Sequence, residues 1–338
     1  MKAAVMEAFD LPLSFKELDI PSPKDNEVII KVESCGVCHS DLHIINGDLP
    51  GFKIATKLPL IPGHEVVGRI VQIGDQVKNL SKGERVGLAW THSACGHCEQ
   101  CQSDLENLCR NRTITGLTVN GGYAEYTCAN ADFVVPIPDT ISSSHAAPLL
   151  CAGVTVYRAL KRANTQAGQQ LAVLGIGGLG HMAVQIGKAM GAIVIAIDRS
   201  QDKLDLAISL GAQHAFNIND ADSLKQIRKL GGAHTAVVTS AQKEAYDFAF
   251  KTLKPAGSLV AVGFPVESLS FSALSIAASE IKIIGSAVGT RRDLREVIEL
   301  AAAGHIQCNI ESQPLENINH VFDRMKEGKI PGRVVITF

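Results

Sequence analysis

Residues 171–180 read LAVLGIGGLG, and this stretch decides the fold. Its first four residues form an apolar run that is typical of a buried strand, and a G-x-G-x-x-G pattern follows at once. Residues 181–190 then have the composition of a helix. Asp198 closes the next apolar run, about twenty residues further on, where this pattern requires an acidic residue. A strand, a glycine loop and a helix in this order predict a unit that binds a dinucleotide.

The glycines of the loop have separate roles in this prediction. Gly175 allows a tight turn, and Gly177 lets the backbone approach a pyrophosphate at the helix N-terminus. Gly178 completes the loop, and Gly180 lets the helix pack closely on the strand.

The acidic residue bears on the choice of dinucleotide. Asp198 would accept hydrogen bonds from the adenosine ribose and repel a 2′-phosphate, which favours NAD over NADP. Two alternatives stay open. Asp198 could be a plain turn residue at a strand end, and Arg199 beside it could weaken the preference for NAD over NADP.

Six apolar runs alternate with helical segments from about residue 153 onward. This alternation implies βαβ units and a parallel sheet in two halves of three strands. The sequence therefore predicts an α/β fold with a Rossmann, doubly wound six-stranded parallel sheet. The expected strands are residues 171–174, 193–197, 214–218, 235–239, 258–262 and 281–284.

The first 150 residues have a different pattern, in which short β-type runs are bounded by Gly, Pro or Asp. Such spacing predicts a β-rich domain built as a partly open barrel or folded sheet. Near the C-terminus, we expect a helix at 293–303 and a last strand at 332–338 that rejoins this domain. The β-type runs are residues 28–32, 66–71, 85–89, 123–128 and 133–137.

Four clustered cysteines give the strongest local signal. Cys95, Cys98, Cys101 and Cys109 follow a C-x₂-C-x₂-C-x₇-C spacing, which can close a tetrahedral shell around one zinc ion. The alternative is a four-cysteine iron–sulfur cluster, but the C-x₃-C-P ending of bacterial ferredoxins is missing. A closed zinc shell has a structural role only. His97 lies between two ligands, and we expect it to be solvated.

A second metal site is predicted from residues far apart in the sequence. Residues 36–43 read GVCHSDLH, which alone could be half of a zinc ribbon formed with Cys35. Cys38, His64 and Cys151 together form a Cys₂His set with the fourth position open, and open three-ligand zinc sites are the catalytic kind.

Length, net charge and cysteine content exclude several classes of function. A length of 338 residues suggests two domains, and a net charge of −2 without a Lys/Arg run argues against nucleic acid or an anionic membrane as partner. We expect no signal peptide and no membrane span, and hence a cytoplasmic protein. Nine cysteines in an unexported protein favour metal binding over disulfides.

Together these motifs resemble the zinc-dependent medium-chain alcohol dehydrogenases, closest to the tetrameric bacterial ethanol-type enzymes. The resemblance implies a GroES-like catalytic domain at residues 1–152, a Rossmann NAD-binding domain at 153–288, and a return to the catalytic domain at 289–338. It implies an active site in the cleft between the domains and a homotetramer. The implied cofactors are NAD and two Zn²⁺ per subunit, one catalytic and one structural.

The implied reaction is reversible hydride transfer between a small primary or secondary alcohol and NAD, which gives the aldehyde or ketone. The nearest alternative is an NADP(H)-dependent aryl or allyl aldehyde reductase of the same superfamily. A polyol dehydrogenase usually has a carboxylate where Cys151 stands. A zinc-ribbon interaction module and a zinc-free binding protein fit the complete ligand set less well.

The resemblance also implies roles for residues near the catalytic zinc. Glu65 is a carboxylate that can transiently approach the metal, and Asp41 orients the ligand His64. Ser40 and His43 form a proton relay.

Other positions are implied to contact the cofactor or the substrate. Trp90 is an aromatic wall of the substrate pocket, or alternatively a core residue. The cofactor positions are His39 and Arg333 near the phosphates, Lys203 near the adenosine ribose and Thr155 against the nicotinamide.

Overall fold

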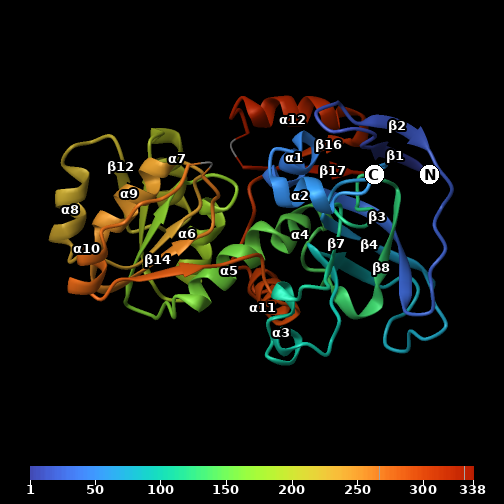
Figure 1. The fold of residues 1–338 in the computed structure, drawn as a ribbon, viewed down its shortest axis with the longest axis horizontal. Coiled ribbons are helices and arrows are strands. Elements are labelled where there is room, and N and C mark those ends of the chain that lie inside the picture. Colours follow the sequence, from blue (N-terminus) through green and yellow to red (C-terminus); the bar gives the residue numbers. More distant parts are fainter. Residues whose placement is uncertain (266, 331) are drawn as a thin grey trace. The chain divides into compact units, whose positions relative to one another are not determined.

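Two large sheets organise the chain, one in each of two compact units (Figure 1). The computed structural model describes residues 1–265, 267–330 and 332–338. No helix within these ranges is long and apolar enough to cross a membrane. The first unit comprises Met1–Cys151, Thr290–Ala302 and Cys308–Phe338, and the second comprises Ala152–Gly289 and Ala303–Gln307.

The sheet of the second unit has six parallel strands in the order β12-β11-β10-β13-β14-β15. The chain starts in the middle and winds outward in both directions, which confirms the predicted doubly wound fold. The strands are β10 (Gln170–Leu174), β11 (Ile193–Asp198), β12 (His214–Asn217), β13 (Ala233–Val238), β14 (Leu253–Ala261) and β15 (Lys282–Gly285). The helices are α5 (Ala152–Arg162), α6 (Gly180–Ala189), α7 (Gln201–Ser209), α8 (Ser223–Lys229), α9 (Lys243–Thr252) and α10 (Ala273–Ala278).

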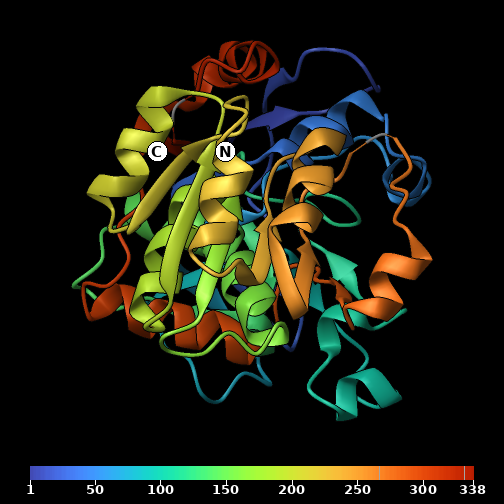
Figure 2. The ribbon, with the colours of Figure 1, turned by 90° about the vertical axis from the view of Figure 1, so that its left-hand side faces the viewer.

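Helices cover both faces of this sheet (Figure 2). The side chain of Leu171 points toward Gly187 of α6, whereas Ala172 and Leu174 join a buried cluster with Tyr246 of α9. Since alternate residues of a strand face opposite ways, both faces of β10 are apolar. This explains why the strand appears in the sequence as a continuous apolar run.

The glycine loop joins β10 to α6 and has the geometry that its sequence predicts. Gly175 has a φ of 90°, which a residue with a side chain rarely adopts. A Cβ atom at Gly180 would lie 1.9 Å from the Gly175 carbonyl oxygen, so only glycine fits there. At Gly177 a Cβ atom would meet nothing within 4 Å, which leaves this side of the loop open.

The main sheet of the first unit has the order β16-β17-β3-β4-β5-β9, and β8 pairs with β3 outside this path. The last strand pairs antiparallel with β3, Val335 opposite Gly36, so the end of the chain is part of this sheet (Figure 1). Two short pairs, β1–β2 and β6–β7, lie outside the main sheet.

The elements of the first unit have the following bounds. The strands are β1 (Lys2–Val5), β2 (Ser14–Glu17), β3 (Glu27–Val37), β4 (Glu65–Ile73), β5 (Arg85–Leu88), β6 (Thr91–Ser93), β7 (Thr113–Ile114), β8 (Tyr126–Asn130), β9 (Val134–Pro136), β16 (Ile310–Pro314) and β17 (Arg333–Thr337). The α-helices are α1 (His39–Asn46), α2 (Pro50–Ala55), α3 (Glu99–Gln102), α4 (Ser143–Ala146), α11 (Arg291–Ala302) and α12 (Ile318–Lys326). The 3₁₀-helices are η1 (Glu106–Leu108), η2 (Ala131–Phe133), η3 (Ala147–Leu150) and η4 (Leu315–Asn317).

Candidate functional site

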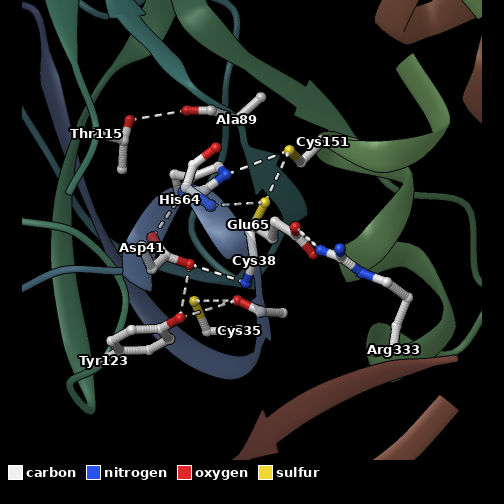
Figure 3. Close-up of polar contacts among 12 residues, drawn as sticks. Cys35, Cys38, Asp41, His64, Glu65, Ala89, Thr115, Tyr123, Cys151 and Arg333 are labelled. Atoms are coloured by element: carbon white, nitrogen blue, oxygen red, sulfur yellow. Dashed lines mark hydrogen bonds and ion pairs between the residues drawn. The ribbon is translucent and has the colours of Figure 1, made fainter. Parts of the chain in front are cut away.

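Three side chains that the sequence marks as zinc ligands converge in the first unit (Figure 3). Cys38 follows β3 and caps the N-terminus of α1, His64 directly precedes β4, and Cys151 follows η3. All three are buried. The Cys38 Sγ atom lies 3.8 Å from the Cys151 Sγ atom, which lies 3.2 Å from His64 Nε2.

These distances fit one tetrahedral zinc ion. Zinc–sulfur bonds of about 2.3 Å place two ligating sulfurs about 3.8 Å apart, and a ligating nitrogen about 3.5 Å from each sulfur. The donor set is also the kind that zinc prefers, with two thiols and one imidazole. One Glu65 carboxylate oxygen completes a group of four ligand atoms that all lie within 4.8 Å of one another.

A single carboxylate holds this centre together. Asp41 Oδ2 accepts a hydrogen bond of 3.0 Å from the Cys38 backbone N–H and one of 2.8 Å from the Tyr123 hydroxyl. Asp41 Oδ1 accepts one of 2.8 Å from His64 Nδ1, so the imidazole turns its other nitrogen toward the thiols. Asp41 can reach the Cys38 N–H because it is the third residue of α1 and forms a capping box with its N-cap.

Of the two buried thiols, Cys38 has the electrostatics of a metal ligand. A hydrogen bond from the Cys151 thiol holds the pKa of Cys38 well below its usual range, although burial acts in the opposite direction. The same hydrogen bond and burial raise the pKa of Cys151. Burial acts to lower the pKa of His64, but the Asp41 carboxylate and Cys38 together outweigh it and the net shift is upward. Cys38 is therefore poised as a thiolate.

The four clustered cysteines form a second group of donors in the first unit. Cys95 Sγ lies 3.9 Å from Cys101 Sγ and 3.6 Å from Cys109 Sγ, again close to the spacing around one zinc ion. Cys98 belongs to the same group of four. His97 is exposed, and its Nδ1 lies 2.8 Å from the Cys95 carbonyl oxygen.

The second unit holds most of the predicted cofactor residues. Asp198 ends β11 and is buried, and its carboxylate accepts hydrogen bonds from the backbone N–H groups of Ile176, Arg199 and Ser200. A carboxylate offers about four acceptor positions, so one remains for a ligand hydroxyl. Lys203 lies half-buried on α7, and Thr155 is buried on α5.

Comparison with known proteins decides the family. The model of the alcohol dehydrogenase GroES-like domain matches residues 24–139, and that of the zinc-binding dehydrogenase matches residues 178–303. The chain is 49% identical over 337 residues to an alcohol dehydrogenase of Geobacillus stearothermophilus, with 99% of each chain covered. The chain belongs to the zinc-dependent medium-chain alcohol dehydrogenase family.

Solved structures show the same relationship. The alcohol dehydrogenase of the archaeon Aeropyrum pernix is similar, with a TM-score of 0.91, 34% identity and 100% of both chains covered. An acetophenone reductase from Geotrichum candidum, solved in complex with NAD, has a TM-score of 0.88 and 32% identity over 100% of this chain and 97% of that one.

Beside the Cys₂His centre of this family member lies a buried ion pair. Glu65 begins β4, Arg333 begins β17, and their side chains pair directly (Figure 3). Burial raises the pKa of Glu65 to about 7, even though Arg333 acts to lower it. Within the described part of the chain, Glu65 Oε2 has no hydrogen-bond partner, so it is available to a cation. The predicted contact of Arg333 with cofactor phosphates stays a prediction.

Helix α1 carries the residues of the predicted proton relay. His39 is exposed and Ser40 is half-buried at the start of the helix, and His43 lies one turn further on. The His43 Nδ1–H donates to the Asp48 carboxylate, with both oxygens at 3.0 Å. This contact leaves Nε2 of a neutral His43 free to accept a proton.

Trp90 packs against His64 of the Cys₂His centre. Its ring is buried and meets the His64 ring edge-on, with the ring centroids 4.8 Å apart. Phe52 of α2 packs on Trp90 at 5.6 Å. The predicted pocket wall therefore lies beside the metal centre, although its role toward substrate stays a prediction.

Two residues of the site were missed from the sequence. Tyr123 falls in a run that we expected to be a strand from residue 123, but β8 begins only at Tyr126. Asp48 follows Gly47, whose φ of 63° ends α1 and turns the chain back toward His43. The sequence does hold a signal for Asp48. Gly47 stands where a glycine ends a helix, and the acidic residue follows it directly.

Removing one partner of the buried ion pair tests this geometry. Arg333→Met leaves the Glu65 carboxylate buried without its cation, which should lower the free energy of unfolding by about 3–5 kcal/mol. Glu65→Gln combined with Arg333→Met should recover part of this loss, because no buried charge is then left. Urea unfolding of both variants measures the effect, and equal stabilities for the single and double variants would contradict the pairing.

Proposed function

We propose that this protein catalyses reversible hydride transfer between a small primary or secondary alcohol and NAD, giving the aldehyde or ketone. One observation carries the proposal: Cys38, His64 and Cys151 place their donor atoms at the spacing of a single zinc ion. Three protein ligands leave the fourth position of a tetrahedral ion for a substrate oxygen. Family membership, with its glycine loop for a dinucleotide, supports the same reaction.

We further propose two zinc ions per chain, one at the Cys₂His centre and one at the four-cysteine centre. When bound at the Cys₂His centre, zinc acts as a Lewis acid on the alcohol or carbonyl oxygen. Cys38 and Cys151 supply thiolates, and Asp41 keeps His64 oriented toward the ion. Cys95, Cys98, Cys101 and Cys109 close their shell completely, so that centre stabilises the loop and takes no part in the reaction.

Proton transfer falls to residues of α1. The Ser40 hydroxyl can take the alcohol proton as it releases its own, and the ring nitrogen of His43 that Asp48 leaves free can take the released proton and pass it to solvent. Asp48 is an acceptor only, so it holds His43 in the tautomer that a general base requires.

We propose that Asp198 selects NAD. Its remaining acceptor position suits a ribose hydroxyl, and its charge would oppose the 2′-phosphate of NADP. Because the carboxylate is already held by Ile176, Arg199 and Ser200, it cannot turn away from that phosphate easily. For the same reason we do not favour the NADP(H)-dependent aldehyde reductase.

The remaining family-level assignments are proposals drawn from the same resemblance. We propose that Gly175, Gly177, Gly178 and Gly180 cradle the pyrophosphate. His39, Lys203, Arg333 and Thr155 contact other parts of the cofactor, and Trp90 borders the substrate. We also propose that the protein is cytoplasmic and forms a homotetramer. Sedimentation analysis of the purified protein tests the oligomeric state, and a monomer would exclude the tetramer.

Ligand variants separate the two metal centres. Cys38→Ser should remove one zinc ion and all turnover while the protein stays folded, because an open catalytic site loses a ligand. Cys98→Ser should instead lower the melting temperature, since a structural zinc contributes folding free energy. Zinc content, melting temperature and alcohol oxidation are measured on both variants. A folded Cys38→Ser protein with full activity and two zinc ions would refute the assignment.

A pH–rate profile tests the relay. His43→Ala should reduce alcohol oxidation by about 10²-fold near neutral pH, because no imidazole accepts the proton. Part of the rate should return at high pH, where hydroxide replaces the imidazole. Asp48→Asn keeps His43 and should cause a smaller loss. A His43→Ala profile that matches the wild type would show that His43 is not in the relay.

Cofactor choice has its own test. NAD gains charge-assisted hydrogen bonds to Asp198 of about 1.5–3 kcal/mol, and NADP meets a repulsion of several kcal/mol at an effective dielectric of about 20. The wild type should therefore prefer NAD by at least about a hundredfold in kcat/KM. Asp198→Ala should weaken NAD use and improve NADP use, since Arg199 then remains near the phosphate. Equal kcat/KM values of the wild type for NAD and NADP would refute this proposal.

A further inference from the structure

Tyr123 places a phenol against the carboxylate that orients the zinc ligand His64. Its side chain is fully buried, as is Asp41, and its hydroxyl lies 2.8 Å from Asp41 Oδ2 (Figure 3). The other acceptor within reach is the Gly36 carbonyl oxygen at 3.5 Å, so the shorter contact takes the proton. Burial and the nearby Asp41 charge raise the pKa of Tyr123, and the phenol stays a donor.

The backbone explains why this hydroxyl reaches the metal centre. Residues 121–123 run beside residues 61–63, where Gly122 N–H donates to the Gly63 carbonyl oxygen and Tyr123 N–H donates to that of Pro62. Gly63, the residue before His64, has a φ of 96°. A Cβ atom there would lie 2.8 Å from the Tyr123 ring, so the ring packs directly over the turn that presents His64.

The ring of Tyr123 makes apolar packing contacts, whereas its hydroxyl makes hydrogen bonds. The ring packs on Gly63 and meets the Phe322 ring edge-on, with the centroids 6.2 Å apart. The hydroxyl reaches the Asp41 carboxylate and, at longer distance, the Gly36 carbonyl oxygen. Phenylalanine in this position would therefore keep the packing and remove one donor from Asp41.

We propose that the Tyr123 hydroxyl is a positioning group for the catalytic zinc, which acts by holding the Asp41 carboxylate against His64 and the Cys38 backbone. The inference rests on the metal-binding part of the proposed function. With Tyr123 donating, Asp41 has a fixed partner on the side away from the metal and presents Oδ1 to His64. Without it, the carboxylate can rotate, and the imidazole loses its fixed orientation toward zinc.

Groups that orient a metal ligand typically contribute 10- to 100-fold to metal affinity. Tyr123 acts one contact further out than Asp41, so we expect Tyr123→Phe to weaken zinc binding at the Cys₂His centre by about tenfold. The four-cysteine centre should be unchanged, because Tyr123 does not contact it. The protein thus carries its own internal control.

The experiment measures zinc transfer from the purified full-length protein to a chromophoric chelator. Tyr123→Phe should release one of two zinc ions at about tenfold lower chelator concentration than the wild type. Tyr246→Phe is the matched control, because Tyr246 is also fully buried and donates its hydroxyl to a backbone carbonyl, that of Gly263. It should release both ions as the wild type does.

A second readout separates positioning from a general loss of stability. In protein with Co²⁺ at the Cys₂His centre, Tyr123→Phe should change the visible absorption bands, and Tyr246→Phe should not. Unchanged zinc affinity and an unchanged cobalt spectrum in Tyr123→Phe would overturn the inference, as would a lower melting temperature alone. Failure of the wild type to bind zinc at Cys38, His64 and Cys151 would instead refute the proposed function.

Discussion

The metal centre depends on one buried anion, the Asp41 carboxylate. An isolated charge in this position would be prohibitively costly, and it persists because three donors satisfy it. Those donors come from Cys38 at the end of β3, from His64 before β4 and from Tyr123 before β8. The carboxylate therefore ties together three segments of chain that are remote in sequence, and two of these segments carry the proposed zinc ligands Cys38 and His64.

Charge balance at the same place favours a divalent cation. Asp41, Glu65 and the two thiols of the centre are all buried and can all be anionic, whereas Arg333 is the cation paired among them. Adding Zn²⁺ brings the sum to within one charge of neutrality, which a low-dielectric interior requires. The hydrogen bond with Cys38 and burial raise the pKa of Cys151, and burial raises that of Glu65, so the protein alone opposes full ionisation of this group.

Much of this structure could be predicted from the sequence because its signals are local. The six strands of the second unit are apolar runs set by burial on both faces, Gly175 has a backbone conformation that demands glycine, and Gly180 has a close contact that does. Cysteines at the spacing of metal ligands predicted the four-cysteine group. The contacts that were not predicted are tertiary. Tyr123 lies 82 residues from its partner Asp41, Arg333 lies 268 residues from its partner Glu65, and no local pattern marks either pairing. Tyr123 looked like a strand residue because aromatic residues favour strands.

The most direct test of this account is the zinc content of Asp41→Asn. Asparagine keeps the shape of Asp41 but loses the charge and turns one oxygen into a donor that faces other donors. The account predicts that this variant stays folded, keeps the zinc of the four-cysteine centre and loses the zinc held by Cys38, His64 and Cys151, together with alcohol oxidation. Two tightly bound zinc ions per chain and wild-type turnover in Asp41→Asn would contradict it.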